Sequence, residues 1–257
     1  MMLVFLYILN VVLITRAPWV FYDEQARSSI LAAGFVIQLS ALLLLQWGFV
    51  VLLLIAGIIL INLITWFLER RTVDQGVKLG ARMVGLACWL VILGFLCSDL
   101  LDVSFNNWTI KMIHRARELS DVLNFVGQNN LLIILACCAG TFLAVVEAHT
   151  AVRFLFQTLN VKPVIKRDDK PGEPASIDQV EYNRGRVIGA LERLMTFFFV
   201  LNGAYGALGF LIAAKGMTRF KQLDDREFAE YFLIGTFLSI ILAGSAALIT
   251  QCLIKIW

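Results

Sequence analysis

The chain has 257 residues, of which 60% are hydrophobic and 16% charged, and its mean hydropathy is +0.80. An average soluble domain is about half apolar and a quarter charged, so this composition excludes an ordinary soluble domain and makes the lipid bilayer the expected surroundings. The net charge of +3 is small, and no basic run alternates with aromatic residues. These features argue against a nucleic-acid-binding surface.

A helix needs about 20 apolar residues to cross about 30 Å of hydrocarbon. We therefore predict an all-α polytopic transmembrane bundle of six or seven spans, forming a single domain over residues 1–257. The first segment lacks a basic start and a cleavage site, so it is not a typical signal peptide, and whether it spans stays open. The long apolar run 30–68 is expected to break at Gln46-Trp47-Gly48. The predicted spans cover residues 2–21, 30–46, 48–68, 79–98, 131–157, 187–214 and 229–256.

Residues 106–128 are too polar to cross a membrane, yet apolar residues such as Trp108 and Met112 recur there at helical spacing. Lys111 and Arg115 fall on the opposite face. This pattern predicts an amphipathic helix lying in the membrane interface. The alternative is a plain surface helix packed on neighbouring spans.

Residues 159–185 contain three prolines and mixed charges, which is typical of a linker. If all seven segments span, thirteen lysines and arginines fall in the first, third and fifth connections and at the C-terminal end. Seven fall in the other connections. Because basic loops stay in the cytoplasm, this bias predicts the N-terminus outside, the C-terminus inside and a cytoplasmic linker. That linker is a candidate docking segment for a soluble cytoplasmic partner.

Small residues recur at helical spacing in three predicted spans, and in lipid they allow close approach of helix backbones. They predict a tightly packed bundle and a homo-oligomer, although the partner helices can belong to the same copy or to another. The predicted packing residues are Gly140, Ala144, Gly203, Gly206, Gly235, Ser239 and Ala243.

Ionisable and polar residues inside spans are costly and often mark function. By depth, one set is predicted to gather in the inner half of the membrane, either as a hydrated pathway or binding site, or as an ion-pair network that locks the helices together. Arg153 is the favoured partner of Glu192. The predicted cluster comprises Asn62, Glu147, His149, Arg153, Glu192 and Arg193.

The sequence predicts neither a metal nor a cofactor. Only two histidines occur, the familiar nucleophile and phosphate-binding motifs are missing, and the sequence does not favour an enzyme. All five cysteines lie in apolar runs, as small packing residues do.

Residues 185–193 read Gly-Arg-Val-Ile-Gly-Ala-Leu-Glu-Arg, followed by Ala213-Ala-Lys215, Arg219-Phe220 and Arg226-x-x-Ala-Glu-Tyr-Phe-Leu-Ile-Gly-Thr236. Over about residues 184–247 the chain resembles the C-terminal part of a bacterial inner-membrane family called domain of unknown function 3307. The resemblance implies a bacterial cytoplasmic membrane and no particular activity. It marks Glu192, Arg193, Lys215 and Arg219 as motif positions.

Three functions remain open at this point. A transport or conduction protein requires charged residues that face a water-filled path for an ion, a proton or a small solute. A membrane anchor or signalling subunit would pair those charges fully and dock a soluble protein through residues 159–185. A lipid-handling enzyme would place Glu147 or Glu192 beside a lateral opening.

Overall fold

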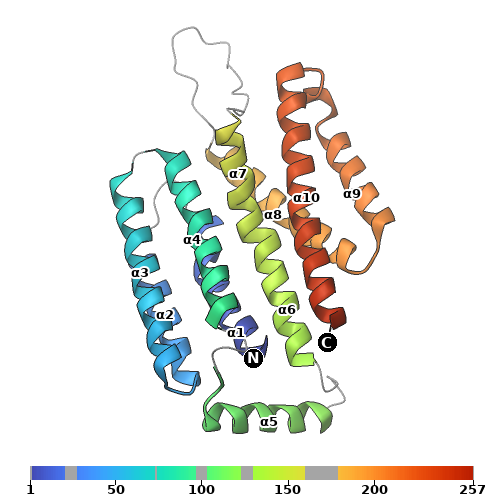
Figure 1. Cartoon of the computed structure of the whole chain (residues 1–257). Helices are drawn as coiled ribbons and strands as arrows, with labels where there is room; N and C mark the ends of the chain where they lie inside the picture. Colours follow the sequence, from blue (N-terminus) through green and yellow to red (C-terminus); the bar gives the residue numbers. More distant parts are fainter. Residues whose placement is uncertain are drawn as a thin grey trace. The chain divides into compact units, whose positions relative to one another are not determined.

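The computed structural model describes residues 2–20, 28–72, 74–96, 103–122, 130–159 and 179–256. Over these ranges the chain is helical, with one isolated backbone bridge between Leu45 and Phe105 and no strand, so the all-α prediction is confirmed (Figure 1). Residues 160–178 of the predicted linker, 123–128 of the predicted interfacial helix, and residues 21, 97 and 98 at predicted span ends lie outside the described residues.

Within the described ranges, five helices are long and apolar enough to cross a membrane. They are Met2–Val20, Phe49–Arg71, Gln75–Phe95, Leu131–Thr158 and Arg226–Lys255. Ser28–Leu44 is apolar but shorter. The predicted count of six or seven spans is therefore not confirmed by helix length and composition alone.

The chain divides into two compact units, which we describe separately. Unit 1 comprises Met1–Phe142 and Cys252–Trp257, and unit 2 comprises Leu143–Gln251.

Unit 1 contains six α-helices in its described residues. α1 (Met2–Arg16) continues into a 3-10 turn (Ala17–Val20), and α2 (Ser28–Ala41) continues into another (Leu42–Leu44). The others are α3 (Phe49–Arg71), α4 (Gln75–Leu96), α5 (Asn107–Val122) and α6 (Asn130–Phe142).

α1 is the central helix of unit 1. It contacts α2, α4 and α6, and Leu6 and Leu13 are fully buried. In the most apolar stretch of Met2–Val20, 56% of the residues are buried, whereas in the corresponding stretch of Phe49–Arg71 only 17% are buried. A helix that is apolar on every side is suited to such a central position, so the segment whose role the sequence left open is the core helix of this unit.

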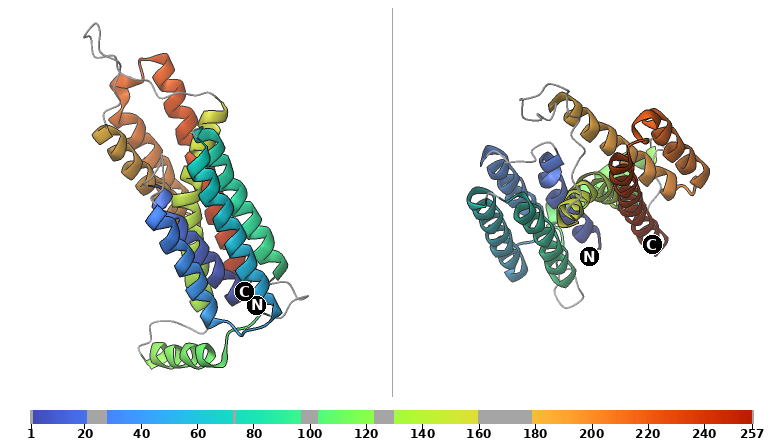
Figure 2. Two further views of the ribbon diagram at one scale, coloured as in Figure 1. Left: turned by 90° about the vertical axis from the view of Figure 1, so that its left-hand side faces the viewer. Right: turned by 90° about the horizontal axis from the view of Figure 1, so that it is seen from above.

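The turn between α2 and α3 is joined to the segment that leads into α5. Gln46 N–H donates to Ser104 O at 2.9 Å, and Asn106 N–H donates to Leu44 O at 3.0 Å. The Thr109 hydroxyl also donates to Leu44 O at 3.0 Å. We call this the loop contact (residues 43–46 and 104–109). It lies where the sequence predicted a break, and it holds α5 across the ends of its neighbours in unit 1 (Figure 2).

Unit 2 begins with a π-helical segment (Leu143–Glu147) that leads into α7 (Ala148–Thr158). Three further helices follow: α8 (Gln179–Leu201), α9 (Tyr205–Thr218) and, after a 3-10 turn (Phe220–Gln222), α10 (Arg226–Ile256). The core of unit 2 combines small residues with two larger ones. Its buried members are Ala144, Phe197, Val200, Ala243, Ala246 and Ala247.

The predicted span over residues 187–214 is wrong as one continuous helix. α8 ends at Leu201, the chain turns through residues 202–204, and α9 returns beside α8 as the second arm of a helical hairpin (Figure 1). Gly203 has φ +68°, in the left-handed region. Glycine reaches this conformation without steric cost and here ends α8. The apolar run continues through the turn, so hydropathy alone did not reveal it.

Candidate functional site

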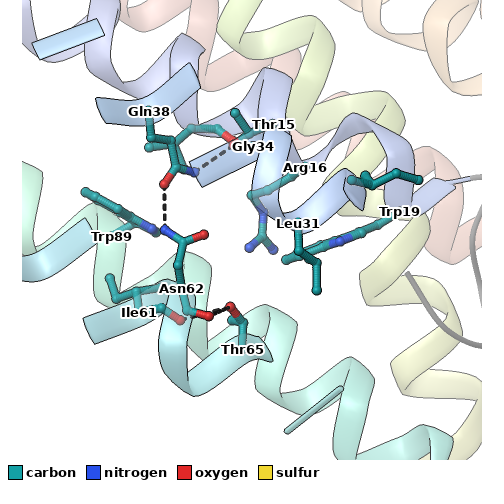
Figure 3. Close-up of a pocket in the computed structure, with 12 residues that line it drawn as sticks. Thr15, Arg16, Trp19, Leu31, Gly34, Gln38, Ile61, Asn62, Thr65 and Trp89 are labelled. Atoms are coloured by element: carbon teal, nitrogen blue, oxygen red, sulfur yellow. Dashed lines mark hydrogen bonds between the residues drawn. The ribbon is translucent and has the colours of Figure 1, made fainter. Parts of the chain in front are cut away.

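In unit 1, three polar side chains form one hydrogen-bonded chain between helices (Figure 3). Asn62 on α3 donates to the Gln38 side-chain oxygen on α2 at 2.7 Å, and Gln38 donates to the Thr15 hydroxyl on α1 at 2.7 Å. Asn62 also donates to Ile58 O at 2.8 Å. Hydrogen bonds between polar side chains add to helix association in lipid, so this chain joins three helices.

The same residues line a pocket of about 30 Å³, together with Arg16 and Trp19 (Figure 3). A pocket of this size has room for one or two water molecules. It is far below the several hundred cubic ångströms typical of a small-molecule site. The geometry therefore favours a hydrated polar joint over a ligand site.

Glu69 and Arg82 form a buried ion pair in unit 1, which the sequence did not single out. Arg82 Nε lies 2.7 Å from Glu69 Oε1, and the two side chains are 3% and 6% exposed. Arg16 donates from Nη2 to Arg82 O at 2.8 Å, and the Trp19 ring lies against both guanidinium groups. Removing one partner of such a pair leaves an uncompensated charge and costs about 3–5 kcal/mol. The sequence signal was Arg82, a cation inside the predicted fourth span.

In unit 2, Glu192 pairs with a lysine from the other arm of the hairpin. Its Oε2 lies 2.5 Å from Lys215 Nζ. The sequence favoured Arg153 as partner and placed Lys215 at the far end of a continuous span. The turn at Gly203 returns α9 to the level of Glu192, so Lys215 is a partner of Glu192, and a contact of Glu192 with Arg153 stays a prediction. Lys215 also lies over the Phe232 ring of α10, 5.5 Å from its centroid, so it joins three helices.

Arg193, the next residue, is 5% exposed. Its Nε and Nη2 have no hydrogen-bond partner within the described residues. The guanidinium lies over Gly189, where an added Cβ would be 3.4 Å from Nη1. Successive residues on a helix do not face each other, and the neighbouring carboxylate of Glu192 is already bonded to Lys215. Arg193 is thus a buried cation, two of whose donor nitrogens have no acceptor among the described residues.

The other predicted cluster residues lie as follows. Glu147 is buried at the end of the π-helical segment, and His149 and Arg153 are half-buried on α7. Arg153 is within electrostatic reach of Tyr231 on α10, as is Arg219. Asn62 belongs to unit 1, so its membership of one cluster with these residues stays a prediction.

The predicted packing residues have different surroundings. An added Cβ on Gly235 would be 2.9 Å from Phe156 Cζ, which shows that the Phe156 ring of α7 packs against α10 at Gly235. Ala144 and Ala243 are fully buried in the core of unit 2, Gly140 is buried, and Ser239 is half-buried. Gly203 and Gly206 are exposed, with no atom within 4 Å of an added Cβ.

Several apolar helices, polar joints between them and an apolar exposed surface make this fold compatible with a multi-pass integral membrane protein. No family model, curated protein or solved structure matches the chain. The resemblance of residues 184–247 to a bacterial inner-membrane family stays a prediction.

Proposed function

We propose that this chain is a multi-pass protein of a bacterial cytoplasmic membrane, in which unit 2 forms part of a pathway for an ion or small solute. The α8–α9 hairpin supports this proposal. Non-helical backbone at membrane depth is tolerated where it is buried in protein or lines a water-filled cavity. Transporters commonly use such interrupted helices at their binding sites.

One arm of the hairpin, α9, is too short to cross. α9 has 14 residues, a rise of about 21 Å at about 1.5 Å per residue, against about 30 Å of hydrocarbon. The other arm, α8, has 23 residues, but only nine of them, residues 193–201, follow Glu192. The proposed arrangement is a re-entrant hairpin that enters and leaves on the same side of the membrane.

The turn of the hairpin is suited to an environment with little water. Gly203 N–H donates to Val200 O at 3.1 Å, and Ala204 N–H donates to Phe199 O at 2.7 Å. The Asn202 side chain donates to Phe198 O at 2.8 Å, and Gln251 of α10 donates to Leu201 O at 3.4 Å. Because an unsatisfied backbone group in lipid costs several kcal/mol, these bonds lower the cost of placing the turn inside the membrane.

A re-entrant hairpin also changes the proposed topology. If the hairpin does not cross, the loop after it lies on the same side of the membrane as residues 159–185. Four basic residues change to that side: Lys215, Arg219, Lys221 and Arg226. Lys255 changes to the opposite side. The bias of thirteen to seven becomes sixteen to four for the same residues, a stronger match to the excess of basic residues in cytoplasmic loops. The proposal therefore has both termini outside, in place of the C-terminus inside.

Unit 1 favours a second role, that of an anchor. Its buried charges and amides bond to one another across helices, as expected of a rigid scaffold. We assign unit 1 the scaffold role and unit 2 the pathway. A homo-oligomer, a soluble partner for residues 159–185 and an interfacial position for α5 are further parts of the proposal, and the exposed Trp108, Ile110 and Met112 of α5 favour the last.

The pathway is tested by flux through reconstituted vesicles. The full chain, with its five cysteines replaced by alanine, is placed in vesicles, and release of potassium, chloride, phosphate and protons is followed with electrodes and a pH dye. We expect at least one species to move faster than in protein-free vesicles. A bulky thiol reagent should slow that flux in Tyr205→Cys, at the hairpin turn, and not in Phe237→Cys on α10; both side chains are more than half exposed.

Absence of flux for every species, with folded protein, would refute the pathway and favour the anchor. Equal inhibition of both cysteine variants would remove the hairpin from the pathway.

A further inference from the structure

Arg193 combines a buried position with an unused hydrogen-bonding edge. Arginine remains charged in proteins, and a buried charge is costly unless it is paired and hydrogen-bonded. Among the described residues, Nε and Nη2 have no acceptor. These two nitrogens form one edge of the guanidinium, a fork that matches two oxygens of a phosphate or carboxylate.

The other face of the guanidinium is held in place by α8 itself. Nη1 occupies the space beside Gly189, one turn earlier, that a side chain would fill. Arg193 also shares the buried face of α8 with Phe197 and Val200, which pack in the core of unit 2. The guanidinium is therefore directed into the protein, where solvent does not complete its hydrogen bonds.

A second unused donor occurs on α10. Thr236 is 5% exposed, and its hydroxyl has no hydrogen-bond partner among the described residues. It shares a helical face with Ala243 and Ala247, which pack against α8 in the core. The unused groups thus lie on the faces of α8 and α10 that supply residues to the core of unit 2.

Two carboxylates of unit 2 are paired with basic side chains, and Glu147 is buried. Glu192 is neutralised by Lys215, and Glu230 is paired with Arg226 at the surface. Arg153 and Arg219 lie near Tyr231, on the same helix as Thr236.

We propose that Arg193 binds an oxyanion, with the Thr236 hydroxyl as a second donor. The inference rests on the proposed function and names its solute class: a small anion with phosphate- or carboxylate-like oxygens. The headgroup of an anionic lipid offers the same oxygens, and the experiment separates the two sources.

The test uses the full chain in nanodiscs of zwitterionic phosphatidylcholine. Inorganic phosphate is titrated at constant ionic strength against chloride, and binding is followed by calorimetry and by the midpoint of thermal unfolding. We expect saturable binding and a rise of the midpoint with phosphate. Arg193→Gln should weaken the affinity at least about tenfold, the usual size of a lost charged hydrogen bond. Thr236→Val should weaken it less.

Two variants serve as controls. Arg226→Gln removes an arginine from the same unit, but its side chain is 91% exposed, so phosphate binding should be unchanged. Arg193→Lys keeps the charge and loses the planar fork, so it should bind with intermediate affinity. If Arg193→Gln does not fold, the two single variants Arg193→Lys and Thr236→Val still test whether phosphate binds at this site.

The lipid arm repeats the measurement with phosphatidylglycerol in the nanodisc. If phosphatidylglycerol raises the wild-type midpoint in an Arg193-dependent way and free phosphate has no effect, the oxyanion is a headgroup. If neither raises it, or if the Arg193 variants respond like the wild type, the inference is overturned. Phosphate binding without flux would refute the pathway alone. Flux that is unchanged in Arg193→Gln, with no phosphate binding, would refute the anion site alone.

Discussion

Replacement of Gly203 by alanine is the most direct test of the hairpin turn. Gly203 has φ +68°, and an added Cβ would meet no atom within 4 Å. Steric overlap with a neighbour is therefore excluded, and only the backbone conformation opposes the side chain. A left-handed conformation costs a non-glycine residue about 1–2 kcal/mol.

Gly206 is a matched control three residues later. It is also exposed with open space around an added Cβ, but it lies inside α9, without the positive φ of Gly203. Alanine is a better helix former than glycine by about 0.5–1 kcal/mol. We expect Gly203→Ala to lower the free energy of unfolding by about 1 kcal/mol, and Gly206→Ala to leave it unchanged or raise it.

The assay is equilibrium unfolding in mixed micelles of a mild detergent and dodecyl sulfate, followed by far-ultraviolet circular dichroism. Gly203→Asn should fall between alanine and glycine, because asparagine tolerates the left-handed region. The reasoning is refuted if Gly203→Ala is as stable as the wild type, or if both alanine variants shift the unfolding midpoint equally.

Two further predictions concern topology and packing. Cysteines placed singly at Ser176 and Asp224 should react with an impermeant thiol reagent from the same, cytoplasmic side of the membrane; labelling from opposite sides would show that the hairpin crosses. Gly235→Ala should lower stability by about 1–3 kcal/mol, because its Cβ would lie 2.9 Å from Phe156 Cζ. Gly244→Ala should have little effect, since its Cβ would lie 3.9 Å from Val200 Cγ2, an ordinary contact distance. Recovery of the first variant by Phe156→Leu, measured by the same unfolding assay, would locate the strain at that ring, and equal losses in the two alanine variants would contradict it.

Hydropathy predicted the helical class and the position of the long apolar helices, because crossing a bilayer demands a run of apolar residues that is visible in the sequence. The break before Phe49 was also visible, since Gln46 and Gly48 interrupt the run. The turn at Gly203 was missed because the segments on both sides are as apolar as a true span, although Asn202-Gly203 is a dipeptide typical of turns. Gly203 and Gly206 were interpreted as packing positions, and the positive φ of Gly203 shows that it belongs to a turn.

The candidate site was partly predictable for the same reason. Glu192 and Arg193 were identified as charges inside an apolar segment, which is a local property of the sequence. The partner of Glu192 depends on which segments lie side by side, and one missed turn moved Lys215 from the far end of a span to the same level. The pair of Glu69 and Arg82 was overlooked because Glu69 follows the predicted third span directly and Arg82 is only the fourth residue of the predicted fourth span, and charges near span ends are commonly solvated.

The loop contact in unit 1 has a consequence for the order in which the chain assembles during synthesis. Leu44 and Gln46 leave the ribosome about sixty residues before Ser104 and Thr109, and α3 and α4 lie between them. Closing so long a loop has an entropic cost that falls sharply once the intervening segments are ordered. The contact should therefore form after α3 and α4 have entered the bilayer as a pair, and a nascent chain released before residue 104 would have these helices without the hydrogen bonds that fix α5 at their ends.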